Sequence, residues 1–274
     1  MPEVPTIELN NGIAMPQVGF GVFQVPEADT AQVVATALDA GYRSIDTAAI
    51  YGNEAGVGAA LKASGIPRDE LFITTKVWNS DQGYDTTLHA FEASLARLGL
   101  DQLDLYLIHW PTPKHAKYLD TWRALEKIYA DGRVRAIGVS NFLPSHLRAI
   151  ADLGGTIPAV NQIEVHPACQ QREAQEANAS LGVVTEAWSP LAQAGVLTDP
   201  AVTSIAGTYG RTAAQVVLRW HLQRGRVAIP KSVTPSRIRE NLDLFDFELT
   251  ADQLNAIDAL ECDGRMGPHP DFFN

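Results

Sequence analysis

The chain has 274 residues, 46% hydrophobic and 19% charged, which is ample apolar material for a full core. Its 21 Lys and Arg against 32 Asp and Glu give a formal net charge of −11, which opposes general binding to nucleic acid or anionic lipid. Two cysteines, Cys169 and Cys262, cannot form a disulfide framework, and no metal-site spacing appears. The opening segment carries acidic residues and no apolar signal region, and no apolar run reaches the length of a membrane span. We expect a cytoplasmic protein without a metal.

The first predicted element is a β-hairpin, in which residues 6–9 and 14–15 pair across an Asn10-Asn11-Gly12 turn. Eight short apolar runs follow, and each is typical of a buried strand. They begin at Gln17, Tyr42, Leu71, Leu103, Val134, Ala159, Gly182 and Arg226.

Helical patterns lie between the runs. The first has Asp29 or Thr30 as its cap, an apolar stripe over residues 33–38 and Gly41 as a left-handed stop. Further helices are predicted at residues 88–98, 119–130, 144–152, 171–181, 212–223 and 235–244. Eight strands alternating with helices in about 250 residues favour an α/β fold of the (β/α)8 TIM barrel type over a doubly wound sheet. No linker divides residues 1–274, so we expect one domain.

Polar residues follow the predicted strands where a barrel places its active site. Asp46 ends the second run, Lys76 lies near the end of the third run before Val77, and His109 lies at the end of the fourth. Tyr51 lies in the loop after Asp46. A carboxylate beside Lys76 would keep the ammonium charged in spite of burial. One charge contact at about 4 Å is worth roughly 4 kcal/mol, which predicts that Lys76 lowers the pKa of Tyr51 from about 10 by two or more units. Tyr51 would then protonate a carbonyl oxygen held by His109.

A local basic cluster follows the eighth run. Lys231 and Ser232 end that strand, and Arg237 lies just inside the next predicted helix. Barrels often hold phosphate near their seventh and eighth loops, and a helix N-terminus flanked by Lys and Arg suits a phosphoryl group. We therefore expect a phosphate-binding segment in a chain that is otherwise acidic.

Two competing motifs are incomplete. In GNEAGVGAAL, Leu61 stands where the third glycine of a dinucleotide-binding G-x-G-x-x-G would be. The segment GVSNF lacks the closing glycine of a nucleophile elbow. Neither a Rossmann domain nor a serine hydrolase is favoured.

The stretches GYRSIDTAAIYGNEAGVGAAL, ITTKVW, DLYLIHWP, IGVSNF, AVNQIEVHP and IPKSVTPSRIREN together resemble the aldo-keto reductase family over nearly the whole chain. DTAAIYGNE, HWPTP and DLFDFELT are most similar to its bacterial 2,5-diketo-D-gluconate reductase branch. The resemblance implies a (β/α)8 barrel that binds NADPH across its C-terminal face without a Rossmann fold.

The same resemblance implies a role for each matching residue. The catalytic residues would be the general acid Tyr51, with Lys76 and Asp46 lowering its pKa and His109 orienting the carbonyl. The residues implied to contact the nicotinamide and pyrophosphate are Ser140, Asn141, Gln162, Trp188, Ser189 and Leu191. Those implied to hold the 2′-phosphate and adenine are Lys231, Ser232, Val233, Thr234, Arg237, Glu240 and Asn241. The substrate walls would be Phe23, Trp78 and Trp110.

Two positions depart from many relatives. Trp188 stands where many carry Tyr, and its indole offers a larger stacking platform. Thr234 stands where some carry an additional Arg, so a preference for NADPH over NADH is expected but its strength is left open.

The leading hypothesis is NADPH-dependent reduction of a small aldehyde or ketone, with diketo sugar acids as one candidate class, by a monomer. A cofactor-binding regulatory or scaffold protein of the same fold is the alternative. A barrel isomerase or lyase using Lys76 as a Schiff base is a third. The segment 111–118 and the tail after Glu261 are brief, which predicts an open substrate pocket.

Overall fold

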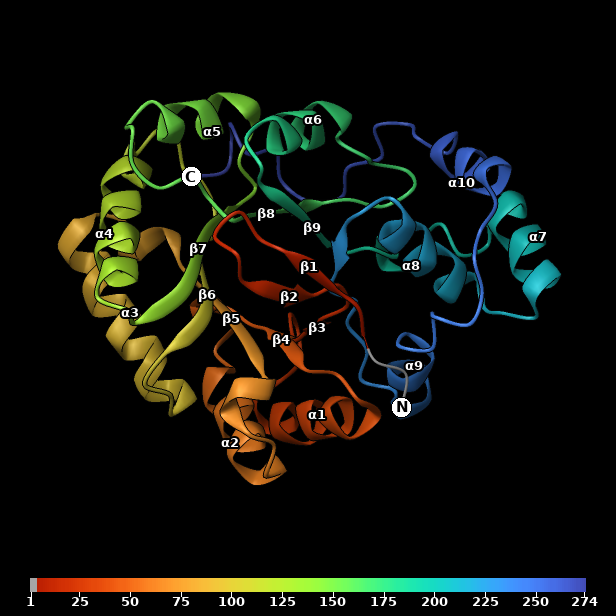
Figure 1. Ribbon diagram of the computed structural model, residues 1–274, viewed down its shortest axis with the longest axis horizontal. Helices are drawn as coiled ribbons and strands as arrows, with labels where there is room; N and C mark the ends of the chain where they lie inside the picture. Colours follow the sequence, from red (N-terminus) through yellow and green to blue (C-terminus); the bar gives the residue numbers. More distant parts are fainter. Residues whose placement is uncertain (1–3) are drawn as a thin grey trace.

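The structure, a computed structural model, describes residues 4–274, so the first three residues of the predicted 1–274 domain lie outside it. The predicted hairpin is confirmed: β1 (Thr6–Glu8) and β2 (Ala14–Pro16) pair antiparallel. It lies across the strands in the middle of the molecule (Figure 1).

The predicted barrel is also confirmed. Eight parallel strands follow one another in chain order around the sheet, from β3 to β10. A parallel bridge between Val18 and Ala228, with the Gly19 amide donating to the Ala228 carbonyl at 2.9 Å, joins the first strand to the last and closes the ring. The strands are β3 (Phe20–Gly21), β4 (Ser44–Asp46), β5 (Phe72–Val77), β6 (Leu103–Ile108), β7 (Val134–Ser140), β8 (Val160–Glu164), β9 (Val184–Trp188) and β10 (Val227–Ala228).

Helices form an outer layer around the strands (Figure 1). They are α1 (Glu27–Ala40), α2 (Glu54–Ser64), α3 (Tyr84–Leu98), α4 (Tyr118–Ala130), α5 (Pro144–Ala151), α6 (Arg172–Ser180), α7 (Pro200–Tyr209), α8 (Ala213–Gln223), α9 (Pro235–Glu240) and α10 (Ala251–Asp258). The patterns had not indicated α2, α7 or α10. In α2 the glycines obscured the pattern, yet Gly58 has a packing reason, because a Cβ there would lie 2.3 Å from the Leu98 carbonyl oxygen at the end of α3.

The predicted cap of α1 is wrong. The helix begins at Glu27, after Pro26 in an extended conformation, and neither Asp29 nor Thr30 is its cap. Instead, the Thr30 hydroxyl donates to the Pro26 carbonyl at 2.8 Å from within the first turn. Proline at the boundary sets the helix start without a side-chain acceptor.

Apolar residues pack on both faces of the strands. The larger cluster packs the outer face of the barrel against the helices. A smaller cluster fills the interior, with Phe72, Leu105, Leu107, Val160 and Val227 among its members. Since successive residues of a strand alternate between its faces, Phe72 shares its face with Lys76, and Val160 shares its face with Gln162. The inward positions therefore change from apolar to polar toward the C-terminal ends of the strands.

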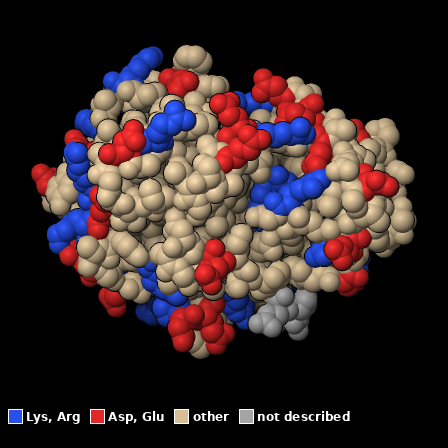
Figure 2. All heavy atoms as spheres, turned by 45° about the horizontal axis from the view of Figure 1, so that its top comes forward, with Lys and Arg blue, Asp and Glu red and all other residues tan. Residues whose placement is uncertain are grey.

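The surface carries mixed charge. Acidic and basic side chains are interspersed over the face shown in Figure 2, unlike the continuous basic strip of a nucleic-acid-binding surface. No helix within residues 4–274 combines the length and apolar character needed to cross a membrane.

Candidate active site

A buried ion pair lies at the centre of the C-terminal face. Lys76, on β5, donates from Nζ to Asp46 Oδ1 at 2.7 Å and to the Thr47 carbonyl at 2.8 Å. Both side chains are buried, so each charge depends on the other for compensation. Burial lowers the pKa of Lys76, but the Asp46 carboxylate and Tyr51 together outweigh burial, and its pKa is raised. Lys76 thus stays a cation, which makes it a poor Schiff-base nucleophile and opposes the lyase hypothesis.

Tyr51 ends a short 3-10 turn, Ala49–Tyr51, directly beyond β4. Its ring centroid lies 5.3 Å from Lys76 Nζ and 5.7 Å from the centroid of the His109 ring, so the predicted four residues do come together. The expected lowering of its pKa is wrong. Burial raises the pKa of Tyr51 by more than the Lys76 charge lowers it, and Asp46 raises it further. Tyr51 is therefore a neutral phenol at physiological pH and retains its proton for donation.

His109 follows β6 and packs edge-on against the Trp78 ring at 5.1 Å between centroids. Burial lowers its pKa well below the usual value, and the nearby Lys76 charge lowers it further. The ring is thus neutral, with one nitrogen carrying a proton. Its Nδ1 has no hydrogen-bond partner among residues 4–274. A neutral imidazole beside a phenol can hold a carbonyl oxygen without adding a charge.

Aromatic side chains wall the space beside these groups. Phe23 lies 5.0 Å from the Tyr51 ring and is 54% exposed, which places it at the rim. The C-terminal tail supplies a wall that its short length had not indicated, because Phe273 packs against Trp110 at 4.6 Å and Trp78 at 6.2 Å between ring centroids. The tail therefore contributes an aromatic wall beside Trp78 and Trp110, and the openness of the substrate pocket stays a prediction.

Four residues implied for the nicotinamide form one network next to the ion pair. Asn141 Nδ2 donates to the His109 carbonyl at 3.0 Å, and Asn141 Oδ1 accepts from Trp188 Nε1 at 2.8 Å. The Ser140 hydroxyl donates to the Gln162 carbonyl at 2.8 Å. The half-buried Trp188 indole is thereby held by one edge, as a stacking platform requires.

Asn141 of this network and Ser189, which follows Trp188, have unusual backbone conformations. Ser189 has a φ of 47° and Asn141 a φ of 63°, both in the left-handed region. Such conformations often mark ligand-binding loops. Leu191, the last residue implied for the pyrophosphate, is partly buried against the core.

The segment implied for the 2′-phosphate is accessible. Lys231 and Arg237 are exposed and form no ion pair with any residue between 4 and 274, so both cations are free to meet an anion. Ser232 Oγ accepts from the Thr234 amide at 3.1 Å, which folds the loop before α9. Val233, Thr234 and Glu240 are exposed, whereas Asn241 is only 5% exposed and lies beneath the surface.

The sequence had not indicated two buried carboxylates. Glu186, two residues before Trp188 on β9, and Glu164, at the end of β8, are both 0% exposed. Glu164 accepts from the amides of Met266 and Gly267 at 2.7 Å and 2.9 Å and so ties the tail to the barrel. The feature of the sequence that could have indicated Glu164 and Glu186 is a charged residue at a strand position that faces the barrel interior.

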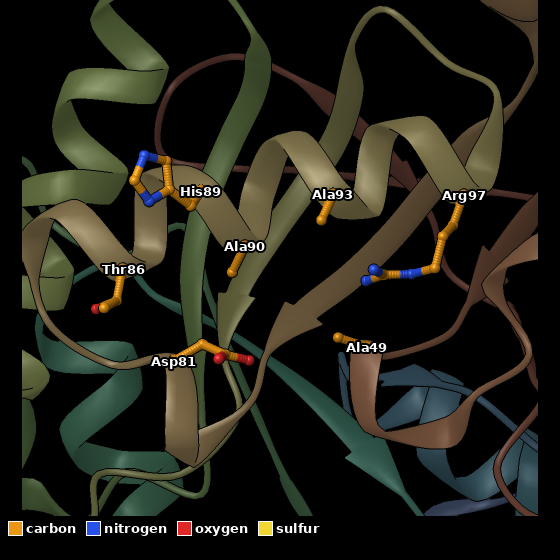
Figure 3. A pocket seen from close by; sticks show the side chains of 7 residues that line it. All are labelled: Ala49, Asp81, Thr86, His89, Ala90, Ala93 and Arg97. Atoms are coloured by element: carbon orange, nitrogen blue, oxygen red, sulfur yellow. The ribbon is translucent and has the colours of Figure 1, made fainter.

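A separate hollow of about 380 Å³ lies outside the barrel, beside α3 (Figure 3). Asp81, His89 and Arg97 contribute its polar groups. The Arg97 guanidinium already pairs with the buried Glu54 carboxylate at 2.6 Å, so its charge is compensated. We assign no ligand there, and no group of three His, Cys, Asp or Glu suited to a metal occurs within the described part of the chain.

Comparison with known proteins agrees with this geometry. The aldo/keto reductase family matches residues 17–261. Glyoxal reductase of Bacillus subtilis (strain 168) is 55% identical over 97% of this chain and 96% of its own length. Methylglyoxal reductase DkgA of Yersinia pestis is 52% identical over 98% of this chain and 97% of its own. The crystal structure of a Gox0644 variant in complex with NADPH superposes with a TM-score of 0.96 at 48% identity, covering 100% of both chains. The chain therefore belongs to the aldo/keto reductase family of oxidoreductases.

Proposed function

We propose that this protein, a single barrel domain, reduces small aldehydes and ketones to alcohols with NADPH. The observation that carries the proposal is the buried Asp46–Lys76 pair beneath a neutral Tyr51 and beside a neutral His109. These groups match the need of carbonyl reduction for a proton donor and a second group that holds the oxygen.

The cofactor supplies a hydride to the carbonyl carbon when it is bound. Tyr51 then gives its proton to the carbonyl oxygen, so that the product is a neutral alcohol and Tyr51 is left as a phenolate. Lys76 stabilises that phenolate through its charge, and Asp46 holds Lys76 in place through the 2.7 Å hydrogen bond. His109 orients the oxygen before the transfer.

The residues present suit the cofactor. Trp188 is fixed at one edge by Asn141 and leaves its ring face for stacking. We assign the nicotinamide and pyrophosphate to Ser140, Asn141, Gln162, Trp188, Ser189 and Leu191, and the adenosine part to residues 231–234, Arg237, Glu240 and Asn241. The free cations Lys231 and Arg237 favour the additional phosphate of NADPH over NADH.

Small dicarbonyl compounds are the substrate class that we favour. Two relatives that match over nearly their full length are named as glyoxal and methylglyoxal reductases. The aromatic walls formed by Trp78, Trp110 and Phe273 suit a small, weakly polar carbonyl compound. Diketo sugar acids, the substrates suggested by the resemblance to 2,5-diketo-D-gluconate reductases, form the second class to test.

We also propose that the protein acts as a cytoplasmic monomer. Asp46, Tyr51, Lys76 and His109 all come from one chain, so no second subunit is needed to complete the site. Its two cysteines are free, which suits a reducing compartment.

Replacement of Tyr51 with Phe tests the proposal. We expect Tyr51→Phe to lower kcat for methylglyoxal on the order of 10²-fold or more while NADPH binding, followed by protein fluorescence, is retained. Tyr84→Phe is the control, because Tyr84 is exposed on the outer layer. An unchanged rate in Tyr51→Phe would refute the role of Tyr51. Tight NADPH binding by the wild type without turnover of aldehydes, diketones or sugar acids would favour the scaffold alternative.

A further inference from the structure

A second buried carboxylate is connected to the ion pair through one amide group. Gln162 Nε2 donates to Asp46 Oδ2 at 2.8 Å and to Glu186 Oε2 at 2.8 Å. Strands β4 and β8 are not neighbours in the sheet, so the bond from Gln162 to Asp46 crosses the barrel interior. Both amide hydrogens are used, which leaves Gln162 Oε1 as the only atom of this amide free for a ligand.

The shared amide brings two carboxylates close together in a site where burial makes charge costly. Glu186 is fully buried, and its Oε1 has no hydrogen-bond partner in the described part of the chain. The pKa of Glu186 is raised to about 8, because burial and, less strongly, the Asp46 charge raise it by more than the Gln162 hydrogen bond and the Lys76 charge lower it. Tyr51 and Lys76 both sense this carboxylate, because Glu186 contributes to the raised pKa of each. Asp46 and Lys76 compensate each other, so the proton on Glu186 decides the net charge of the cluster.

Glu186 lies directly below the platform assigned to the nicotinamide. Glu186 and Trp188 are two residues apart on β9 and therefore point to the same face of the sheet, about 7 Å apart along the strand. The nicotinamide ring carries a positive charge only in the oxidised cofactor. An ionised Glu186 would attract that charge, whereas a protonated Glu186 would not.

We propose that Glu186 is a positioning residue that, together with Asp46, fixes the Gln162 amide with its oxygen toward the nicotinamide carboxamide, and that it releases its proton when the oxidised cofactor binds. The inference rests on the proposed function, because it requires the nicotinamide to lie on Trp188. It gives this site a preference between reduced and oxidised cofactor that depends on pH.

The direction in which pH changes cofactor preference follows from linkage between proton binding by Glu186 and cofactor binding. At low pH Glu186 is neutral and the cluster does not favour the oxidised ring. As pH rises through the titration of Glu186, the buried negative charge strengthens NADP⁺ binding relative to NADPH. At a separation of about 10 Å and an effective dielectric near 20, the ratio of the two dissociation constants should change roughly tenfold.

The test is a fluorescence titration of NADP⁺ and NADPH against the full chain between pH 6.5 and 9.5. The 2′-phosphate is common to both cofactors and cancels in the ratio of dissociation constants. A Tyr51→Phe background removes the other proton that could respond to the oxidised ring. In that background we expect Kd(NADP⁺)/Kd(NADPH) to fall roughly tenfold across the range, and to become independent of pH when Glu186→Gln is added.

Glu54→Gln in the same background is the matched control, because it replaces a fully buried carboxylate on α2 that bonds to Thr75 and Arg97 instead of Gln162. It should keep the pH dependence. A ratio that is flat with pH in the Tyr51→Phe protein overturns the inference even if Glu186→Gln fails to fold. It leaves the proposed function intact, whereas failure of both cofactors to bind the wild type overturns both.

Discussion

Removal of one partner from the Asp46–Lys76 pair should lower the free energy of unfolding more than removal of both. In Lys76→Met, Asp46 remains buried without its 2.7 Å hydrogen bond to Nζ, and the Thr47 carbonyl loses its 2.8 Å donor. An uncompensated buried charge of this kind costs about 3–5 kcal/mol of unfolding free energy. Asp46→Asn strands the Lys76 cation instead and should cost a similar amount.

The double variant Asp46→Asn with Lys76→Met contains neither charge. Its amide oxygen can still accept from Gln162, so the main loss is the unpaired Thr47 carbonyl, worth about 1–3 kcal/mol. The double variant should thus be more stable than either single variant, although all three lose carbonyl reduction.

Urea unfolding at pH 7, followed by tryptophan fluorescence, measures the four corners of this cycle. Stability losses that simply add, so that the double variant is less stable than both singles, would refute the claim that the pair is held together by mutual charge compensation. Circular dichroism before unfolding checks that each variant keeps its helices.

Two other changes test the cofactor assignments. Arg237→Ala should raise the KM for NADPH far more than the KM for NADH in steady-state assays, because the exposed guanidinium is assigned to the 2′-phosphate; equal effects would contradict that assignment. Gly267→Ala would place a Cβ 2.4 Å from Trp188 Cη2 and displace the indole, so the Kd for NADPH should rise roughly tenfold. Gly207→Ala, where a Cβ meets nothing within 4 Å, is its control and should leave binding unchanged.

The sequence predicted the barrel because each strand is a short apolar run and each run ends in polar residues. That pattern also brought Asp46, Lys76 and His109 to one face, since parallel strands of a barrel share their C-terminal ends. Helix α2 was missed because Gly56 and Gly58 lower helix propensity, and their purpose appears only in three dimensions: a Cβ on either would collide with Thr30 or Leu98 of a neighbouring segment.

The tail was unpredictable for a related reason. Nothing near Phe273 in the sequence indicates that its ring lies against Trp110, 163 positions earlier in the chain, because that contact depends on the path of the tail across the barrel. The pKa of Tyr51 was unpredictable for a similar reason. The sequence correctly predicted that Lys76 lowers this pKa. Burial raises it by a larger amount, and the extent of burial is known only from the packed structure. Burial and charge therefore act against each other at this phenol, and the positive charge of a bound oxidised nicotinamide would shift that balance toward the phenolate.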